Sequence, residues 1–320
     1  MRICKEKRMR IIDVPYDFTS YEFYSNILPQ IKISGEEEIV LDMSFTRRIE
    51  PLVIPNLLCL AYQRKNDCGI ILKLLIPDTA TGGLIRNYLN EIGFTKYAIR
   101  TGLFEFIQDP YGGLEGKKID PICGTLVFNA SDSRDDIYRG VDMCITPFSE
   151  EYLARFQIYD KDKYRYMNEI TAFLEEILIN CKIHAKSFSI TTLHANYSTK
   201  KIYISVSDVG CGFLSTTEES GIEDEKQAIL NGVYKRKNSK VYGLYNVIRR
   251  VLEYDGKVRI HSNDTQLVFT PRVLNEFKEE CLENMESFEK YNVKHTQLYN
   301  GVHIEIELPL EKGNNNVHNR

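Results

Sequence analysis

In the first hundred residues, short apolar runs alternate with stretches of helical periodicity. Residues 39–43 and 70–76 are apolar runs of the length of buried strands. Residues 55–65 and 84–92 repeat their apolar positions at helical spacing, and Gly93 follows the second stretch as a C-terminal stop signal. Two strands alternating with two helices predict an open α/β domain with parallel pairing, within residues 1–110.

The middle of the chain, residues 111–162, follows the turn-rich Asp109-Pro110-Tyr111 and contains the turn signal Asp120-Pro121. We expect this segment to connect two domains and to hold strands near residues 124–128 and 143–146. The last residues, 311–320, are polar, and we expect a flexible tail there.

A long amphipathic helix is predicted from residue 164 to residue 185. Its apolar face consists of residues spaced three or four apart: Ile170, Leu174, Ile177 and Cys181. Glu176, Asn180 and His184 are spaced four apart and therefore stack on one side of the helix. A solvated polar stripe would give the same spacing. Chemically, the amide oxygen of Asn180 suits Mg²⁺, and the Glu176 carboxylate can accept a proton from a nucleophile.

A second motif follows a predicted hairpin. Residues 202–207 alternate apolar and polar side chains, which predicts a half-buried strand that runs directly into Asp208. The Asp208 carboxylate can accept a hydrogen bond from an exocyclic amine. Gly210 and Gly212 allow positive φ and let a flat ring or a phosphate approach the backbone. The same D-x-G-x-G sequence also occurs in ordinary turns.

A third motif opens another helix at Gly243-Leu244. The helix has an apolar stripe formed by Leu244, Val247, Ile248, Val251 and Leu252. Gly256 is expected to close the segment. The free N–H groups at a helix N-terminus attract anions, and Gly243 lets the backbone approach one closely. A glycine before a helix is also a common N-cap.

In combination, the three motifs resemble the N, G1 and G2 boxes of the GHKL, or histidine-kinase-like, ATPase superfamily. The resemblance extends over residues 163–310 and includes a lid segment between the second and third boxes and a closing strand at residues 302–309. It implies an α/β sandwich with a mixed sheet and helices on one face. It also implies that ATP and Mg²⁺ are bound: Asn180 would bind Mg²⁺, Glu176 would act as general base, and Asp208 would contact the adenine N6 amine.

The same resemblance implies roles for the remaining motif residues. Gly210 and Gly212 would line the adenine and the lid hinge, Gly243 and Leu244 would approach the phosphates, and His184 would end the N box. For His184, a packing or capping role is the alternative.

The chain departs from the family pattern at its phosphate end, where Val241 occupies a glycine position. Phosphate contact would then rely on nearby basic residues: Lys235, Arg236, Lys237 or Lys240. An exposed basic loop is the alternative for this cluster. Residues 271–301 form an insertion with a helical pattern.

The N-terminal domain resembles the STAS domains of bacterial regulators of anti-sigma factors. The resemblance rests on the strand that ends in Asp42, the helix after it and the second strand. In signalling members of that family, a serine near the start of the helix accepts phosphate. Residues 49–55 contain no serine, so we expect no phospho-switch here.

Composition limits the partners and the compartment. A net charge of -4 and a pI near 6.0 favour neither nucleic acid nor an anionic membrane. The charged N-terminus, the lack of a long apolar run and eight scattered cysteines favour a cytoplasmic protein. No histidine precedes His184, which argues against a complete, self-phosphorylating sensor histidine kinase.

Three functions stay open. The first is an enzyme, either a regulatory ATPase or a kinase resembling the anti-sigma-factor serine kinases, and Glu176 favours it. The second is a non-catalytic switch in which ATP changes a dimer or partner surface, and Val241 favours that. The third is a scaffold with vestigial motifs. We expect a protein partner or substrate. A homodimer is possible both for the enzyme and for the switch.

Overall fold

The computed structural model describes most of the chain, namely residues 9–32, 35–111, 122–129, 131–156, 161–180, 185–196, 199–217, 222–234, 236–237, 240–241, 243–274 and 294–310. The chain divides into two compact units, Met1–Asp120 and Pro121–Arg320. It belongs to the α/β class, with a parallel sheet in the first unit and an antiparallel sheet in the second. None of the helices in the described ranges combines the length and apolar character needed to cross a membrane.

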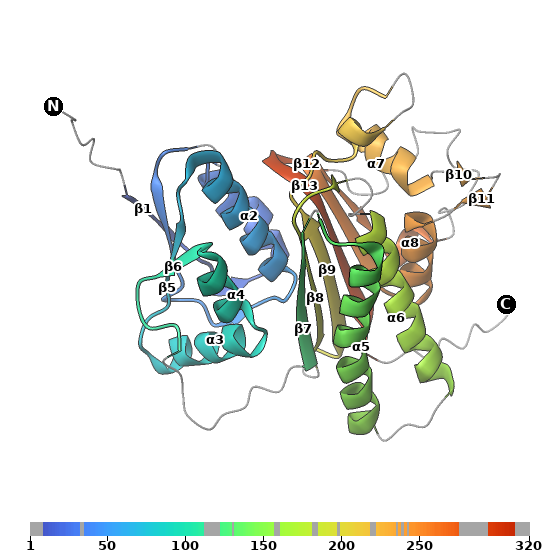
Figure 1. Ribbon diagram of the computed structural model, residues 1–320, viewed down its shortest axis with the longest axis horizontal. Helices are drawn as coiled ribbons and strands as arrows, with labels where there is room; N and C mark the ends of the chain where they lie inside the picture. Colours follow the sequence, from blue (N-terminus) through green and yellow to red (C-terminus); the bar gives the residue numbers. More distant parts are fainter. Residues whose placement is uncertain are drawn as a thin grey trace. The chain divides into compact units, whose positions relative to one another are not determined.

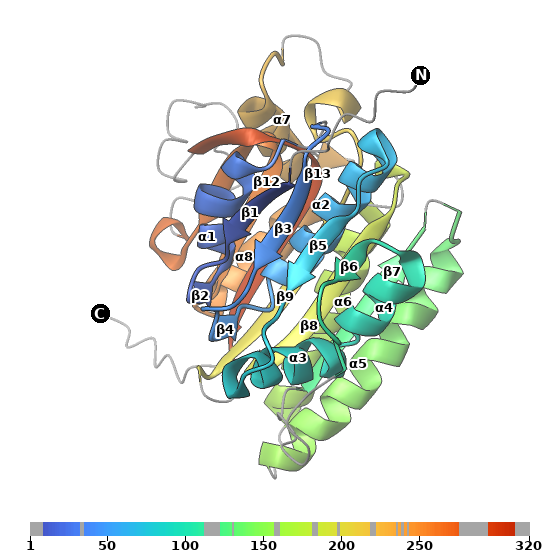
Figure 2. The ribbon, with the colours of Figure 1, turned by 90° about the vertical axis from the view of Figure 1, so that its left-hand side faces the viewer.

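The first unit is built on a parallel four-stranded sheet (Figure 2). Its strand order is β1 (Met9–Asp13), β3 (Glu38–Asp42), β5 (Leu72–Leu75) and β6 (Phe104–Phe106). Helices connect the successive strands: α1 (Ser20–Glu22) with the turns η1 (Phe23–Ile27) and η2 (Leu28–Gln30), then α2 (Val53–Cys68), then α3 (Ala80–Glu91) and α4 (Phe94–Thr101). A short parallel pair, β2 (Asp17–Phe18) and β4 (Arg48–Ile49), joins two loops. The predicted alternation of strands and helices and the parallel pairing are confirmed.

The second unit is built on a five-stranded sheet. Its strand order is β12 (Lys257–Phe269), β13 (Lys294–Pro309), β9 (Lys201–Asp208), β8 (Ser189–Asn196) and β7 (Ile122–Phe128). All four pairings are antiparallel, so the prediction of a mixed sheet was wrong. Two helices, α5 (Arg134–Phe156) and α6 (Lys161–Asn180), connect β7 to β8. Helices α5 and α6 thus return the chain to a neighbouring strand that runs antiparallel to β7.

Helix α5 also corrects the strand predicted near residues 143–146. Ser133 and Asp136 cap its start reciprocally: the Ser133 N–H donates to the Asp136 carboxylate at 2.8 Å, and the Asp136 N–H donates to Ser133 Oγ at 3.2 Å. The buried side chains of α5 recur at helical spacing: Ile137, Val141, Cys144, Ile145 and Phe148. The strand near residues 124–128 is confirmed as β7. The segment expected to be a connection therefore supplies a strand and a helix to the second unit.

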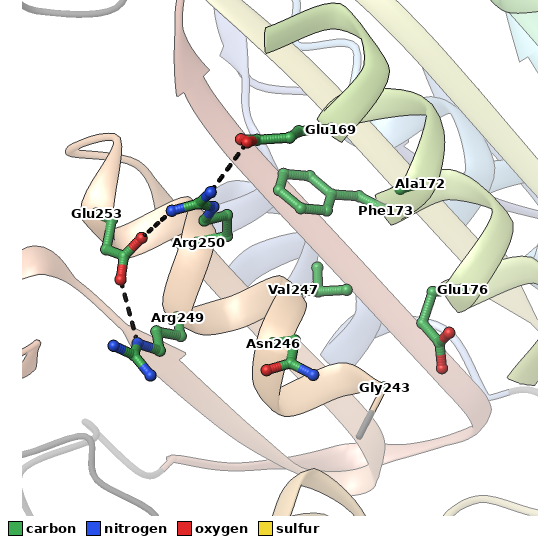
Figure 3. Close-up of a pocket in the computed structure, with 10 residues that line it drawn as sticks. All are labelled: Glu169, Ala172, Phe173, Glu176, Gly243, Asn246, Val247, Arg249, Arg250 and Glu253. Atoms are coloured by element: carbon green, nitrogen blue, oxygen red, sulfur yellow. Dashed lines mark hydrogen bonds and ion pairs between the residues drawn. The ribbon is translucent and has the colours of Figure 1, made fainter. Parts of the chain in front are cut away.

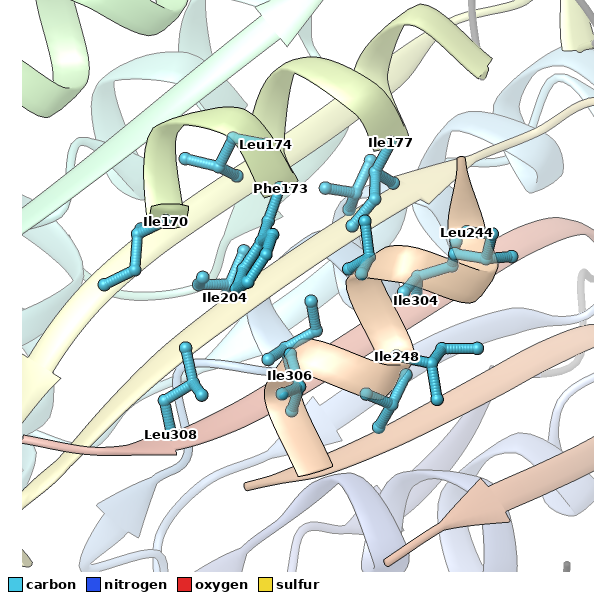
Figure 4. Close-up of a cluster of buried hydrophobic side chains, with 14 of the residues drawn as sticks. Ile170, Phe173, Leu174, Ile177, Ile204, Leu244, Ile248, Ile304, Ile306 and Leu308 are labelled. Atoms are coloured by element: carbon cyan, nitrogen blue, oxygen red, sulfur yellow. The ribbon is translucent and has the colours of Figure 1, made fainter. Parts of the chain in front are cut away.

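The core of the second unit fixes α6 against α8 (Leu244–Glu253). Helices α5, α6 and α8 cover one face of the sheet (Figure 1). Their apolar faces meet inward-facing strand residues (Figure 4), among them Ile170, Leu174 and Ile177 of α6, Ile204 of β9, Leu244 and Ile248 of α8, and Ile304 and Ile306 of β13. Burying each such side chain contributes about 1.5–3 kcal/mol. The predicted apolar faces are confirmed, apart from Cys181, which lies outside the described residues.

The second unit also contains several shorter described elements. They are the turn η4 (Leu214–Thr216), helix α7 (Glu225–Tyr234), the short pair β10 (Arg236–Lys237) and β11 (Lys240–Val241), and the turn η5 (Pro271–Val273). The end of the predicted insertion is not helical, because Lys294–Gln297 already belong to β13. Gly256 follows α8 as expected, but the residue with positive φ is Asp255, at 59°.

A buried histidine pair makes the stability of this unit depend on pH. His303 of β13 is fully buried, stacks on Tyr299 at 4.2 Å and pairs with His261 across the strands. Burial lowers the pKa of His303 from 6.5 to about 3. Between these two values the unfolded chain binds more protons than the folded protein, so stability falls as the pH is lowered.

We expect His303 by itself to reduce the free energy of unfolding by about 2 kcal/mol between pH 7.5 and pH 5. Urea unfolding at the two pH values measures this loss. His303→Phe keeps a ring for Tyr299 and should show a correspondingly smaller pH dependence. An equal dependence in both proteins would contradict the prediction.

Candidate functional site

Two of the predicted site residues project from the last turns of α6. Glu176 and Asn180 are both half-buried, and the Asn180 Nδ2 donates to Glu176 Oε1 at 3.3 Å. The i, i+4 spacing of a helix produces this contact. The third residue of the predicted stripe, His184, lies outside the described residues, as do Cys181–Ile183.

Gly243 brings the third motif into contact with the first. It is the N-cap of α8, with φ 66° and ψ −124°, a conformation open essentially to glycine alone. A Cβ at this position would lie 2.7 Å from Glu176 Oε1 and 3.8 Å from Asn180 Nδ2. The Gly243 backbone therefore lies directly against the Glu176 carboxylate. No side chain caps this end of α8, and the Leu244 side chain is buried in the core.

Asp208 is held at the end of β9 by backbone hydrogen bonds. It is 1% exposed, and its Oδ1 accepts from the Gly210 N–H at 2.8 Å and from the Val302 N–H at 3.1 Å. Such charge-assisted bonds offset the cost of burying a carboxylate. They also fix the carboxylate between the turn and the closing strand β13.

The two glycines of this turn serve close packing. Positive φ is confirmed for Gly212, at 82°, but Gly210 does not have it. Gly210 is needed because a Cβ there would lie 2.6 Å from the Cβ of Ala185, just beyond α6. A Cβ on Gly212 would overlap Asn263 and lie 2.9 Å from Glu225 Oε1. Both glycines therefore allow close contacts within the protein, Gly210 with Ala185 and Gly212 with Asn263 and Glu225.

The sequence interpretation missed Glu225, the first residue of α7. Its carboxylate is 6% exposed and accepts hydrogen bonds from the Phe213 N–H at 2.8 Å, the Leu214 N–H at 3.3 Å, Ser262 Oγ, and Asn263 Nδ2 at 3.2 Å. It thus ties the residues after the D-x-G-x-G turn to α7 and β12. An acidic residue in the first turn of a helix is commonplace, so the sequence gives no signal that separates this one.

A groove of about 510 Å³ runs between α6 and α8 (Figure 3). Glu176 and Gly243 lie at one end, and Phe173 and Val247 line its middle. At the other end Arg250 bonds both Glu253, at 2.7 Å, and Glu169, at 3.1 Å.

The far end of the groove is permanently charged. The Arg249 Nε donates to Glu253 at 3.1 Å, and the Tyr254 hydroxyl donates to Glu169. The hydrogen bond to Glu253 raises the pKa of Arg250. Burial and the bond to Glu169 raise the pKa of Tyr254 to about 12. The guanidinium and the phenol therefore keep their protons throughout the physiological pH range.

Three of the basic residues predicted for phosphate contact, Arg236, Lys237 and Lys240, belong to β10 and β11. Arg236 and Lys237 pair with Val241 and Lys240 in this short antiparallel ladder. Only their backbone is described, and Lys235 lies outside the described residues. Val241 is in an extended strand.

No protein-family model and no curated protein matches this chain. The chemistry of the three motifs and their geometry therefore carry the functional argument.

Proposed function

We propose that the second unit binds Mg-ATP in the manner of the GHKL ATPases and acts on it as an ATPase or a protein kinase. The observation that carries this proposal is the contact of Gly243 with Glu176 and Asn180, which joins motifs far apart in the sequence. The packing of Gly210 on Ala185 brings the Asp208 turn to the same end of α6. We further propose that the first unit, with its parallel sheet, is a STAS-like regulatory domain.

The residues present fit both groups. Asn180 directs its Nδ2 at Glu176, which leaves its amide oxygen as the Mg²⁺ ligand. Mg²⁺ usually takes only one or two oxygens from the protein and the rest from phosphates and water. The N-terminus of α8, uncapped by any side chain, suits the phosphates, and Asp208 suits the adenine amine. Bound Mg²⁺ would supply positive charge that neutralises the phosphates.

In this proposal Glu176 accepts the proton of the nucleophile, a water molecule or a hydroxyl group. Asn180 and the Gly243 backbone restrain its carboxylate from two sides. A positioned general base of this kind contributes about 10²- to 10⁴-fold to a rate. The alternative is a non-catalytic switch driven by ATP binding. The β-branched, extended Val241 favours it, because this residue cannot supply the backbone freedom of a glycine hinge.

Calorimetric titration with Mg-ATP tests the binding step. We expect Asn180→Ala to weaken binding about 10- to 100-fold, since the loss of a hydrogen bond or ligand to a charged group costs roughly 1.5–3 kcal/mol. Asn129→Ala, at an exposed asparagine after β7, is the control and should bind as wild type does. A wild-type protein that binds no Mg-ATP, or an Asn180→Ala variant that binds it equally well, would overturn the proposal.

A further inference from the structure

The groove between α6 and α8 begins at the proposed catalytic base and continues well beyond it. Glu176 and Gly243 form its near end, and Arg249 lies six residues along α8 from Gly243. At 1.5 Å per helical residue, the backbones of Gly243 and Arg249 are about 9 Å apart along α8. ATP bound at the α8 N-terminus would leave this outer part of the groove for another molecule.

The two ends of the groove carry opposite charge. The near end holds the Glu176 carboxylate. At the far end three arginines, Arg165, Arg249 and Arg250, share two carboxylates, those of Glu169 and Glu253, so one positive charge is in excess. Arg249 and Arg250 both line the groove, and Arg249 is the more exposed of these two, with 52% of its side chain exposed and its Nε bonded to Glu253. A guanidinium has five N–H donors, so Arg249 can also bind a carboxylate in the groove.

Between its charged ends the groove has the apolar side chains of Phe173 and Val247, with the polar Asn246 beside Val247 (Figure 3). An occupant that matches this pattern has a hydroxyl group at one end, an apolar centre and an acid at the other end. An extended polypeptide spans about 9 Å with three residues, at ~3.3 Å per residue.

We infer that this groove binds an extended segment of a protein substrate, with a hydroxyl residue at Glu176 and an acidic residue three positions away at Arg249. The inference rests on the proposed function and names its acceptor. The hydroxyl oxygen bonds to the γ-phosphorus of ATP, the bond from that phosphorus to the bridging oxygen breaks, and ADP leaves with its electron pair. Glu176 takes the hydroxyl proton.

Fluorescence anisotropy with two labelled peptides tests the groove without nucleotide. The peptide Glu-Leu-Leu-Ser-Leu-Leu-Glu carries an acid three positions from serine in both directions, and its partner has lysine in place of both glutamates. We expect wild type to bind the acidic peptide about tenfold more tightly, the size of one interfacial charge pair. Arg249→Glu should reverse this preference, and Arg249→Gln should abolish it.

Arg139→Glu is the matched control, because it makes the same charge change at an exposed arginine of α5. It should keep the wild-type preference. Mass spectrometry should find phosphate on the serine of the acidic peptide after incubation with Mg-ATP. The groove assignment is wrong if wild type binds both peptides equally, or if Arg249→Glu leaves the preference unchanged. Mg-ATP calorimetry tests the proposed function separately. If Arg249→Glu reverses the preference but wild type binds no Mg-ATP, the peptide groove is supported and the ATP site is rejected.

Discussion

Replacing Glu176 by glutamine is expected to leave Mg-ATP binding intact and to lower the rate of γ-phosphate release or transfer about 10²- to 10⁴-fold. Glutamine keeps the size of the side chain and an oxygen that can accept from Asn180, so the contact with Gly243 persists. It removes the ability to accept a proton. Glu176→Gln should therefore keep the wild-type affinity for Mg-ATP while its turnover rate falls. Labelled γ-phosphate ATP measures the rate, and calorimetry measures the affinity.

Glu175→Gln is the matched control for Glu176→Gln, since it makes the same change one residue earlier on α6. Burial, together with Asp142 of α5, raises the pKa of Glu175, whereas the side chains nearest the Cβ position of Gly243 are those of Glu176 and Asn180. Its replacement should leave the rate within about twofold. Unchanged turnover in Glu176→Gln would reject Glu176 as the base. A wild type that binds Mg-ATP but releases and transfers no phosphate would instead favour the non-catalytic switch.

The parts of the site that follow from local periodicity could be predicted from the sequence. Helical spacing alone places Asn180 one turn from Glu176, and strand alternation alone leads β9 into Asp208. The apolar stripe of α8 likewise positions Gly243 at a helix start. Each of these features depends on a few neighbouring residues, which is the range over which a sequence pattern is informative.

The parts that depend on contacts between distant segments could not be predicted. Nothing in the residues around Gly212 indicates that Glu225 and Asn263 close over it. The mixed sheet was expected from the family resemblance, whereas the antiparallel pairings join segments that no local pattern relates. Helix α5 was missed for a local reason. The apolar pair Cys144-Ile145 resembles a short strand, and Pro147 inside the helix interrupts its pattern.

Gly301 shows how such a distant contact determines the site. It has φ 102°, and a Cβ there would overlap the carbonyl oxygen of Asp208 and lie 2.8 Å from its carbonyl carbon. Both atoms belong to the backbone of β9, which is hydrogen-bonded to β13 from Ser207 and His303 onward. A side chain at Gly301 must therefore push the two strands apart beside Asp208. The same displacement would break the bond from the Val302 N–H to the Asp208 carboxylate.

We expect Gly301→Ala to lower the free energy of unfolding of the second unit by about 3–5 kcal/mol, the sum of backbone strain and overpacking. It should also weaken Mg-ATP binding, because Asp208 loses its position. Hydrogen exchange of peptides that span β9 and β13 measures the stability of this unit separately from the first. Gly69→Ala is the control for positive φ alone, since Gly69 has φ 68° with no atom within 4 Å of its Cβ position. That substitution should cost only about 1–2 kcal/mol in its own unit. A loss no larger than this in Gly301→Ala would mean that β9 and β13 can separate cheaply, and that Asp208 is not held by the closing strand.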